Sequence, residues 1–150
     1  MLNPSFMAKK VVFLDFDGVL IPMRGKLSAK DFHPDCVGGL NLILTVSGAG
    51  IVVCSSWRHD VGRDMLGTLL DNGISIDPTM YLGFTPDDPE DRRGYEIARW
   101  IEQHQFSGEF VILDDDDQME PVQEHLVPIN ADDGLTKENV VDALAILMEE

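Results

Sequence analysis

The chain has 150 residues, of which 44% are hydrophobic and 25% are charged, a composition typical of one soluble globular domain with a sizeable core. Its net charge is less ordinary: 27 acidic against 11 basic side chains give -16, which argues against strong non-specific binding to nucleic acid or to an anionic membrane. No apolar stretch approaches the roughly 20 residues that cross a bilayer, so we expect no association with a membrane.

Apolar patterns with the period of a strand alternate along the chain with patterns that have the period of a helix, which predicts an α/β domain with a mainly parallel central sheet. Strands are expected at residues 11–15, 51–54, 80–82, 110–113 and 126–129. Helices are expected at 34–47, 60–71 and 94–105, and a last one follows the N-cap Thr136 and runs to about 148. Residues 21–32 are predicted to be a loop, and the acidic, proline-containing residues 85–93 an exposed one. We expect a single domain over 1–150, with residues 1–8 as a flexible tail.

The two cysteines do not belong to a C-x-x-C motif, and Cys54 lies in an apolar strand. We interpret Cys36 and Cys54 as reduced packing residues of a cytoplasmic protein, with a disulfide between them as the alternative. Residues 1–10 lack the apolar region of a signal peptide, which agrees with a cytoplasmic location.

Two of the predicted strands end in aspartates. Asp15 and Asp17 follow the apolar run 11–14, and four consecutive aspartates at 114–117 follow the run 110–113. Unbroken apolar runs suit strands covered on both faces, and open α/β sheets bind ligands outside the carboxyl ends of their strands. If the two strands are neighbours, the acids converge, and a cation or a proton must offset their repulsion. An oxygen-rich group of ligands without histidine favours Mg²⁺.

The sequence Asp15-Phe16-Asp17-Gly18 carries groups that suit phosphoryl transfer. One carboxylate can attack phosphorus and form an acyl phosphate. The second, two residues later, can protonate the leaving oxygen and then activate water. Gly18 allows a sharp turn that brings backbone amides near a bound phosphate. The motif is short, and a turn or a solvated acidic loop is the alternative interpretation.

Polar side chains of useful types also follow two other predicted elements. Ser55 and Ser56 follow the second strand, where a hydroxyl can donate to a phosphoryl oxygen without adding charge. A cap or turn role for Ser55 is equally compatible with the pattern. Arg92 and Arg93 precede the helix before the fourth strand, where a cation can neutralise the nucleophile and the phosphoryl group. The alternative is an ordinary surface arginine.

Trp57 and Arg58 carry separate hypotheses. Arg58 follows the second strand and is a candidate to bind a substrate phosphate. Trp57 beside it could stack on a base or another ring of a substrate, although tryptophan is more often a core residue.

Five segments of the chain together resemble a known family. They are Phe13-Leu14-Asp15-Phe16-Asp17-Gly18-Val19-Leu20, Cys54-Ser55-Ser56-Trp57-Arg58, Arg93-Gly94-Tyr95-Glu96-Ile97 with Trp100, Ile112-Leu113-Asp114-Asp115-Asp116-Asp117-Gln118-Met119, and Gly134-Leu135-Thr136. The order of these motifs resembles that of the haloacid dehalogenase-like (HAD) superfamily. Their residues resemble those of the HAD domains of Swiss Army knife RNA repair proteins. The resemblance covers most of the chain. It implies a Rossmann-like three-layer sandwich with a mainly parallel central sheet and no cap domain.

The resemblance also implies roles for the acidic residues. Asp15 would be the nucleophile and a Mg²⁺ ligand. Asp17 would be the general acid and base, with its backbone carbonyl also near the metal. Asp114 and Asp115 would hold Mg²⁺ directly or through water.

The remaining matched residues would bind the substrate. Ser55 would orient the phosphoryl group, and Arg93, or else Arg92, would replace the lysine that many relatives have at this point. Gly18, Ser56 and Arg58 complete the set of candidate substrate-binding residues, to which Arg92 also belongs.

These features predict a Mg²⁺-dependent phosphatase that works through an aspartyl-phosphate. A capless site would accept a phosphorylated small molecule, macromolecule or nucleic-acid end. The relatives favour nucleic-acid ends, whereas the net charge of -16 argues against tight binding to nucleic acid. Two other classes stay open: an HAD-like module that binds Mg²⁺ and partners without turnover, and a receiver-like phosphoacceptor domain, less favoured because no lysine fits after the last strand.

Overall fold

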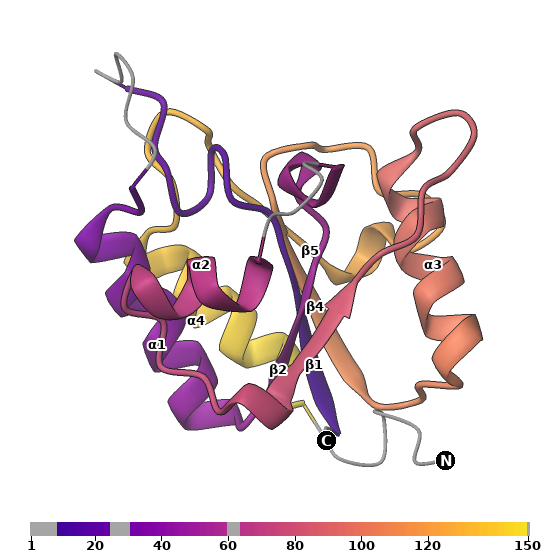
Figure 1. The fold of residues 1–150 in the computed structure, drawn as a ribbon, viewed down its shortest axis with the longest axis horizontal. Helices are drawn as coiled ribbons and strands as arrows, with labels where there is room; N and C mark the ends of the chain where they lie inside the picture. Colours follow the sequence, from indigo (N-terminus) through magenta and orange to yellow (C-terminus); the bar gives the residue numbers. More distant parts are fainter. Residues whose placement is uncertain (1–8, 25–30, 60–63, 150) are drawn as a thin grey trace.

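The structure, a computed structural model, describes residues 9–24, 31–59 and 64–149, except for the side chains of Arg58 and His59. The tail predicted at residues 1–8 lies outside these ranges. Five parallel strands form the central sheet (Figure 1). They are β1 (Lys10–Leu14), β2 (Gly50–Val53), β3 (Tyr81–Phe84), β4 (Glu109–Asp114) and β5 (Leu126–Pro128).

The strand order β3-β2-β1-β4-β5 places β1 at the centre of the sheet. Leu14, the last residue of β1, lies beside Val53 of β2 and Leu113 of β4. The carboxyl ends of these three strands therefore meet at one edge. All five strands lie close to their predicted bounds, and the expectation of a mainly parallel sheet is confirmed.

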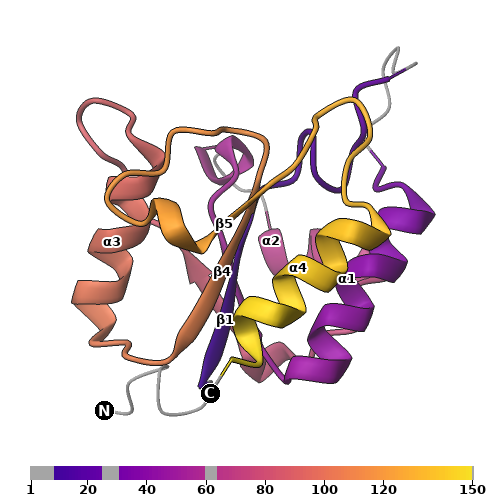
Figure 2. The same ribbon diagram turned by 180° about the vertical axis from the view of Figure 1, so that it is seen from behind.

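Helices cover both faces of the sheet (Figures 1 and 2). One face carries α1 (Pro34–Ser47), α2 (Met65–Asp71) and α4 (Lys137–Leu147), and the other carries α3 (Arg93–His104). Successive side chains of a strand point to opposite faces, so Val12 packs in the first core and Phe13 in the second. The resulting three-layer α/β sandwich confirms the predicted fold class.

The connections between strands are short in the part of the chain that the structure describes. A loop and α1 lie between β1 and β2, and a loop and α3 lie between β3 and β4. These described segments hold no cap domain, as the sequence predicts. Cys36 and Cys54 are both buried free thiols. None of the described helices has the length and apolar character that crossing a membrane requires.

The start of α2 differs from its prediction. The helix expected over 60–71 begins at Met65, and residues 60–63 lie outside the described ranges. The carboxylate of Asp64 accepts a hydrogen bond from the backbone N–H of Gly67, 2.9 Å away, and caps the helix. By contrast, α1 has its predicted bounds, and Thr136 is the N-cap of α4 as predicted.

The prediction that residues 85–93 form an exposed loop is wrong in part. Thr85 and Asp88 are buried, and Arg93 is the first residue of α3 rather than a loop residue. The buried carboxylate of Asp88 is stabilised by the guanidinium of Arg92, 2.9 Å away, and by hydrogen bonds from the backbone N–H groups of Glu90 and Arg92.

Gly94 allows α3 to pack directly against the backbone that follows β4. A Cβ atom at this position would collide with the carbonyl oxygens of Met119 and Glu120. We therefore expect Gly94→Ala to lower the free energy of unfolding by about 1–3 kcal/mol, measured by urea denaturation. Gly38→Ala is the matched control, because Gly38 is a helical glycine with open space around it. It should be neutral or stabilising by up to about 1 kcal/mol. Equal effects of the two substitutions would contradict the packing argument.

Candidate active site

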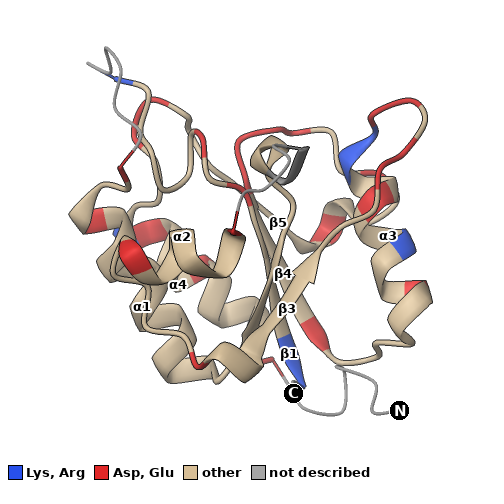
Figure 3. Cartoon of the chain, viewed as in Figure 1, with Lys and Arg blue, Asp and Glu red and all other residues tan. Residues whose placement is uncertain are grey.

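Three carboxylates meet at the carboxyl edge of the sheet. Asp15 directly follows β1, Asp114 is the last residue of β4, and Asp115 comes next. One oxygen of each lies within 4.8 Å of the others. Asp15 and Asp114 are buried, whereas Asp115 is exposed. Figure 3 shows acidic residues along the loops at this edge of the molecule.

Backbone amides hold the two buried acids in place. The N–H of Phe16 donates to Oδ1 of Asp15 at 2.8 Å, and the N–H of Asp116 donates to Oδ1 of Asp114 at 3.0 Å. The hydrogen bond from the N–H of Asp15 to the carbonyl of Leu113, 3.1 Å long, extends the pairing of β1 with β4 by one residue. The two acids are thus fixed by the ends of neighbouring strands.

Arg93 supplies the positive charge among these acids. Its Nη1 lies 2.6 Å from Oδ2 of Asp114 and 3.7 Å from Oδ2 of Asp15. The other candidate, Arg92, pairs instead with Asp88 at 2.9 Å and lies over the ring of Tyr95. Of the two arginines, the structure places Arg93 in the acidic cluster and Arg92 at the loop beside it.

The cluster has more negative charge than the protein itself neutralises. Burial raises the pKa of Asp15 to about 8, and repulsion from Asp114 adds to this effect while Arg93 opposes it. Burial also raises the pKa of Asp114 to about 6, against the attraction of Arg93. A divalent cation would relieve the excess charge, and three carboxylates without histidine fit a hard ion such as Mg²⁺.

The side chain of Asp17 is not one of the three whose oxygens lie within 4.8 Å of one another. Its Oδ2 accepts a hydrogen bond from the indole N–H of Trp57, 2.9 Å away. The turn that follows β1 is tight, because the carbonyl of Phe16 accepts hydrogen bonds from the backbone N–H groups of residues 19, 20 and 21. The backbone of Asp17, which the resemblance places near a metal, belongs to this turn.

Position 18 requires glycine because its backbone lies very close to Asp115. Its φ of 80° lies in the left-handed region, and a Cβ atom there would lie 2.5 Å from Oδ2 of Asp115. The predicted substrate-binding glycine thus sits directly against one of the candidate metal ligands.

Ser55 follows β2 and is fully buried. The N–H of Cys54 donates to the carbonyl of Leu14, so Ser55 lies beside the end of β1. Its hydroxyl accepts a hydrogen bond from the N–H of Trp57 at 3.2 Å. Ser56 is exposed and begins the 3₁₀ helix η2 (Ser56–His59), and the side chain of Arg58 lies outside the described residues.

Two contacts at the site were not predicted. Cys54, interpreted from the sequence as a packing residue, also directs its thiol toward Oδ2 of Asp114 at 3.9 Å. Trp57 contacts Asp17, whereas the sequence offered only a core or a stacking role. The sequence signal for both contacts was position: Cys54 and Trp57 follow β2 and flank Ser55 and Ser56, which were already candidate site residues.

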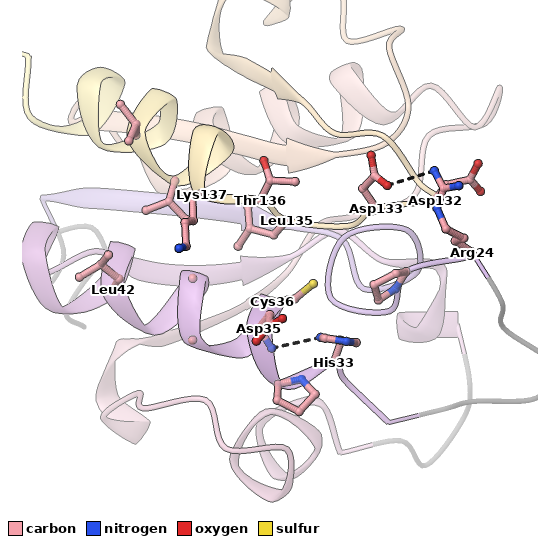
Figure 4. A pocket seen from close by; sticks show the side chains of 16 residues that line it. Arg24, His33, Asp35, Cys36, Leu42, Asp132, Asp133, Leu135, Thr136 and Lys137 are labelled. Atoms are coloured by element: carbon pink, nitrogen blue, oxygen red, sulfur yellow. Dashed lines mark hydrogen bonds and ion pairs between the residues drawn. The ribbon is translucent and has the colours of Figure 1, made fainter.

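Figure 4 shows a groove between the N-terminal ends of α1 and α4. Its volume is about 1020 Å³. An ion pair between Arg24 and Asp133 lies at its rim, and Nδ1 of His33 accepts a hydrogen bond from the N–H of Asp35. No candidate site residue is among the described residues that line it. The chemistry of the acids, rather than the size of a hollow, therefore locates the site.

A protein-family model described as the HAD domain in Swiss Army Knife RNA repair proteins matches residues 11–140. The chain belongs to this family. The match confirms the resemblance drawn from the sequence motifs and agrees with the capless α/β fold of the HAD domain. No curated protein and no solved structure matches the chain significantly.

The raised pKa of Asp15 makes the stability of this HAD domain depend on pH when divalent cations are removed. Folding raises this pKa from 3.8 to about 8, so the folded state favours the protonated carboxyl. The resulting stability is present below about pH 4 and is lost as the pH rises toward 8. Asp15→Asn removes this loss. We expect the free energy of unfolding of D15N, relative to wild type, to be clearly higher at pH 8 than at pH 5 in EDTA. A difference that is the same at both pH values would contradict this explanation.

Proposed function

We propose that this HAD domain is a Mg²⁺-dependent phosphatase that forms an aspartyl-phosphate on Asp15. The observation that supports this best is the cluster of Asp15, Asp114 and Asp115, with ligand oxygens within 4.8 Å of one another, beside the guanidinium of Arg93. Bound Mg²⁺ would neutralise these carboxylates and withdraw charge from the phosphoryl oxygens. The family of the chain supports the same general class of reaction.

In the first half of the reaction, a carboxylate oxygen of Asp15 would attack phosphorus while the bond from phosphorus to the ester oxygen breaks. Asp17 would donate a proton to the departing oxygen, so that an alcohol leaves rather than an alkoxide. Arg93, 3.7 Å from Oδ2 of Asp15, would favour the ionised nucleophile and attract the transferred phosphoryl group.

In the second half, water would attack the phosphorus of the acyl phosphate while Asp17 accepts its proton. The bond from phosphorus to Asp15 breaks, which releases inorganic phosphate and restores both carboxyl groups. Ser55, beside the end of β1, would orient the phosphoryl group. Gly18, whose φ of 80° lies in the left-handed region, would let the backbone turn toward the phosphoryl group.

The substrate we propose is a phosphorylated macromolecule, with a nucleic-acid end as the first choice. The absence of a cap in the described residues and the exposure of Asp115 and Ser56 support an open site. The family is that of HAD domains in RNA repair proteins. The net charge of -16 opposes extended contact with a phosphate backbone, so recognition would centre on the terminal phosphate.

Phosphate release from an aryl phosphate is the first measurement. We expect turnover that requires Mg²⁺ and falls about 10³-fold or more in D15N, because the nucleophile is lost. Asp142→Asn, at an exposed position on α4, is the control for removing one acid and should leave turnover unchanged.

The same measurement on 3′- and 5′-phosphorylated oligonucleotides and on small phosphometabolites would identify the substrate class. A lower KM for oligonucleotide ends would support the proposed substrate. If the folded protein binds Mg²⁺ but releases phosphate from no member of this panel, the proposal is wrong and the domain is a non-catalytic binding module.

The two adjacent arginines allow a matched comparison. Arg93→Gln and Arg92→Gln each remove one positive charge, but of the two arginines only Arg93 contacts the cluster of Asp15 and Asp114, whereas Arg92 pairs with Asp88. R93Q should lower kcat/KM about 10²-fold or more, since it removes a donor beside the reacting phosphoryl group. R92Q should change kcat/KM by less than about fivefold, the range of a partly exposed ion pair. A larger loss in R92Q than in R93Q would reverse the assignment.

A further inference from the structure

The hydrogen bond between Trp57 and Asp17 joins two segments of the candidate site. Trp57 lies in η2, after β2, and Asp17 lies in the turn after β1. The indole Nε1 lies 2.9 Å from Oδ2 of Asp17, a good distance for an N–H donor. The indole N–H is only a donor and is uncharged. It can therefore hydrogen-bond to the Asp17 carboxyl group whether that group is ionised or protonated.

Aromatic packing fixes the indole that makes this hydrogen bond. The ring of Trp57 lies edge-on to that of Phe16, with centroids 5.2 Å apart and an angle of 88°, and it also contacts Phe32. The backbone N–H of Trp57 donates to the hydroxyl of Ser55. Because Phe16 precedes Asp17 directly and is fully buried, donor and acceptor are held by the same packed turn.

A general acid must place its proton on the leaving oxygen, and a carboxyl group on a flexible side chain does so only when its rotation is restricted. The hydrogen bond from the indole N–H to Oδ2 restricts the rotation of the Asp17 carboxyl group. We propose that Trp57 is a positioning residue that aims the carboxyl of Asp17 at the leaving group. This inference rests on the proposed phosphatase function.

Kinetics on different substrates can separate this positioning role from the core role and the stacking role that the sequence allows for Trp57. A core residue alone would affect stability and all substrates equally. A residue that stacks on a base would affect KM for substrates with a base. A residue that positions the general acid affects most strongly those substrates whose leaving group needs a proton.

The experiment compares kcat/KM for an aryl phosphate with a good leaving group and for an alkyl phosphate with a poor one. This constant reports on steps up to the departure of the leaving group, before water attacks. Trp57→Phe keeps an aromatic ring and removes the N–H donor. We expect W57F to lose about 10- to 100-fold in kcat/KM for the alkyl phosphate and less than about threefold for the aryl phosphate.

Two further variants test whether the effect acts through Asp17. Asp17→Asn should show the same preference for the aryl phosphate with a larger loss on the alkyl phosphate. The double variant W57F/D17N should lose no more than D17N alone, because both changes disable one function. Trp100→Phe is the control for loss of an indole, since Trp100 packs in the opposite core against Phe13. W100F should change kcat/KM for both substrates by the same factor, since Trp100 does not contact Asp17.

Each outcome decides one claim. Equal losses on the two substrates in W57F would make Trp57 a structural residue, and a higher KM confined to oligonucleotide substrates would make it a stacking residue. Both results overturn the inference while leaving the phosphatase intact, provided that wild type turns over and D17N discriminates between leaving groups. If wild type releases phosphate from neither substrate, the proposed function fails and the inference fails with it.

Discussion

The burial of two neighbouring carboxylates, those of Asp15 and Asp114, is the constraint on which the rest of the site depends. Burial raises the pKa of both groups, repulsion from Asp114 raises that of Asp15 further, and the guanidinium of Arg93 opposes both effects without cancelling them. Charge balance near neutral pH therefore requires either a proton on Asp15 or a cation from outside the chain. A proton would block attack on phosphorus, whereas a divalent cation would leave the carboxylate ionised. The proposed dependence on Mg²⁺ and the proposed role of Asp15 as nucleophile thus follow from the same burial of negative charge.

The position of Arg93 depends in turn on how α3 packs. Gly94 brings the first turn of this helix against the backbone of residues 119–120, and Trp100 anchors it by an edge-on contact with Phe13 of β1. The same strand that carries Asp15 at its end therefore also carries the aromatic residue against which α3 is set. Because α3 also begins at Arg93, the guanidinium reaches Asp15 and Asp114 from a fixed point. Core packing on one face of the sheet sets the electrostatics at its edge.

The sequence was sufficient to predict the sheet and the meeting of its acids, since unbroken apolar runs that end in aspartate identify buried strands and their ligand-binding ends. It could not choose between Arg92 and Arg93. Arg92 is the extended N-cap of α3 and Arg93 is the first helical residue, so the two side chains leave the backbone in different directions. Arg93 reaches the acids of the cluster, while Arg92 pairs with Asp88. Nor could composition show that Asp88 is buried. Its acidic surroundings indicate an exposed loop, but backbone N–H groups of the same loop turn inward and satisfy its carboxylate.

The middle residue of the motif Asp15-Phe16-Asp17 is more than a spacer between two acids. Its backbone N–H donates to Oδ1 of Asp15 and helps to fix the group proposed to attack phosphorus. Its buried ring contacts the indole of Trp57, whose N–H holds the carboxyl of Asp17. The backbone of Phe16 thus helps to fix the acidic cluster, and its ring helps to fix the indole beside Asp17, the residue proposed to transfer protons. Two carboxyl groups only two positions apart can take different roles because this anchored residue contacts both: its N–H helps to fix Asp15 in the acidic cluster, and its ring packs against the indole that donates to Asp17.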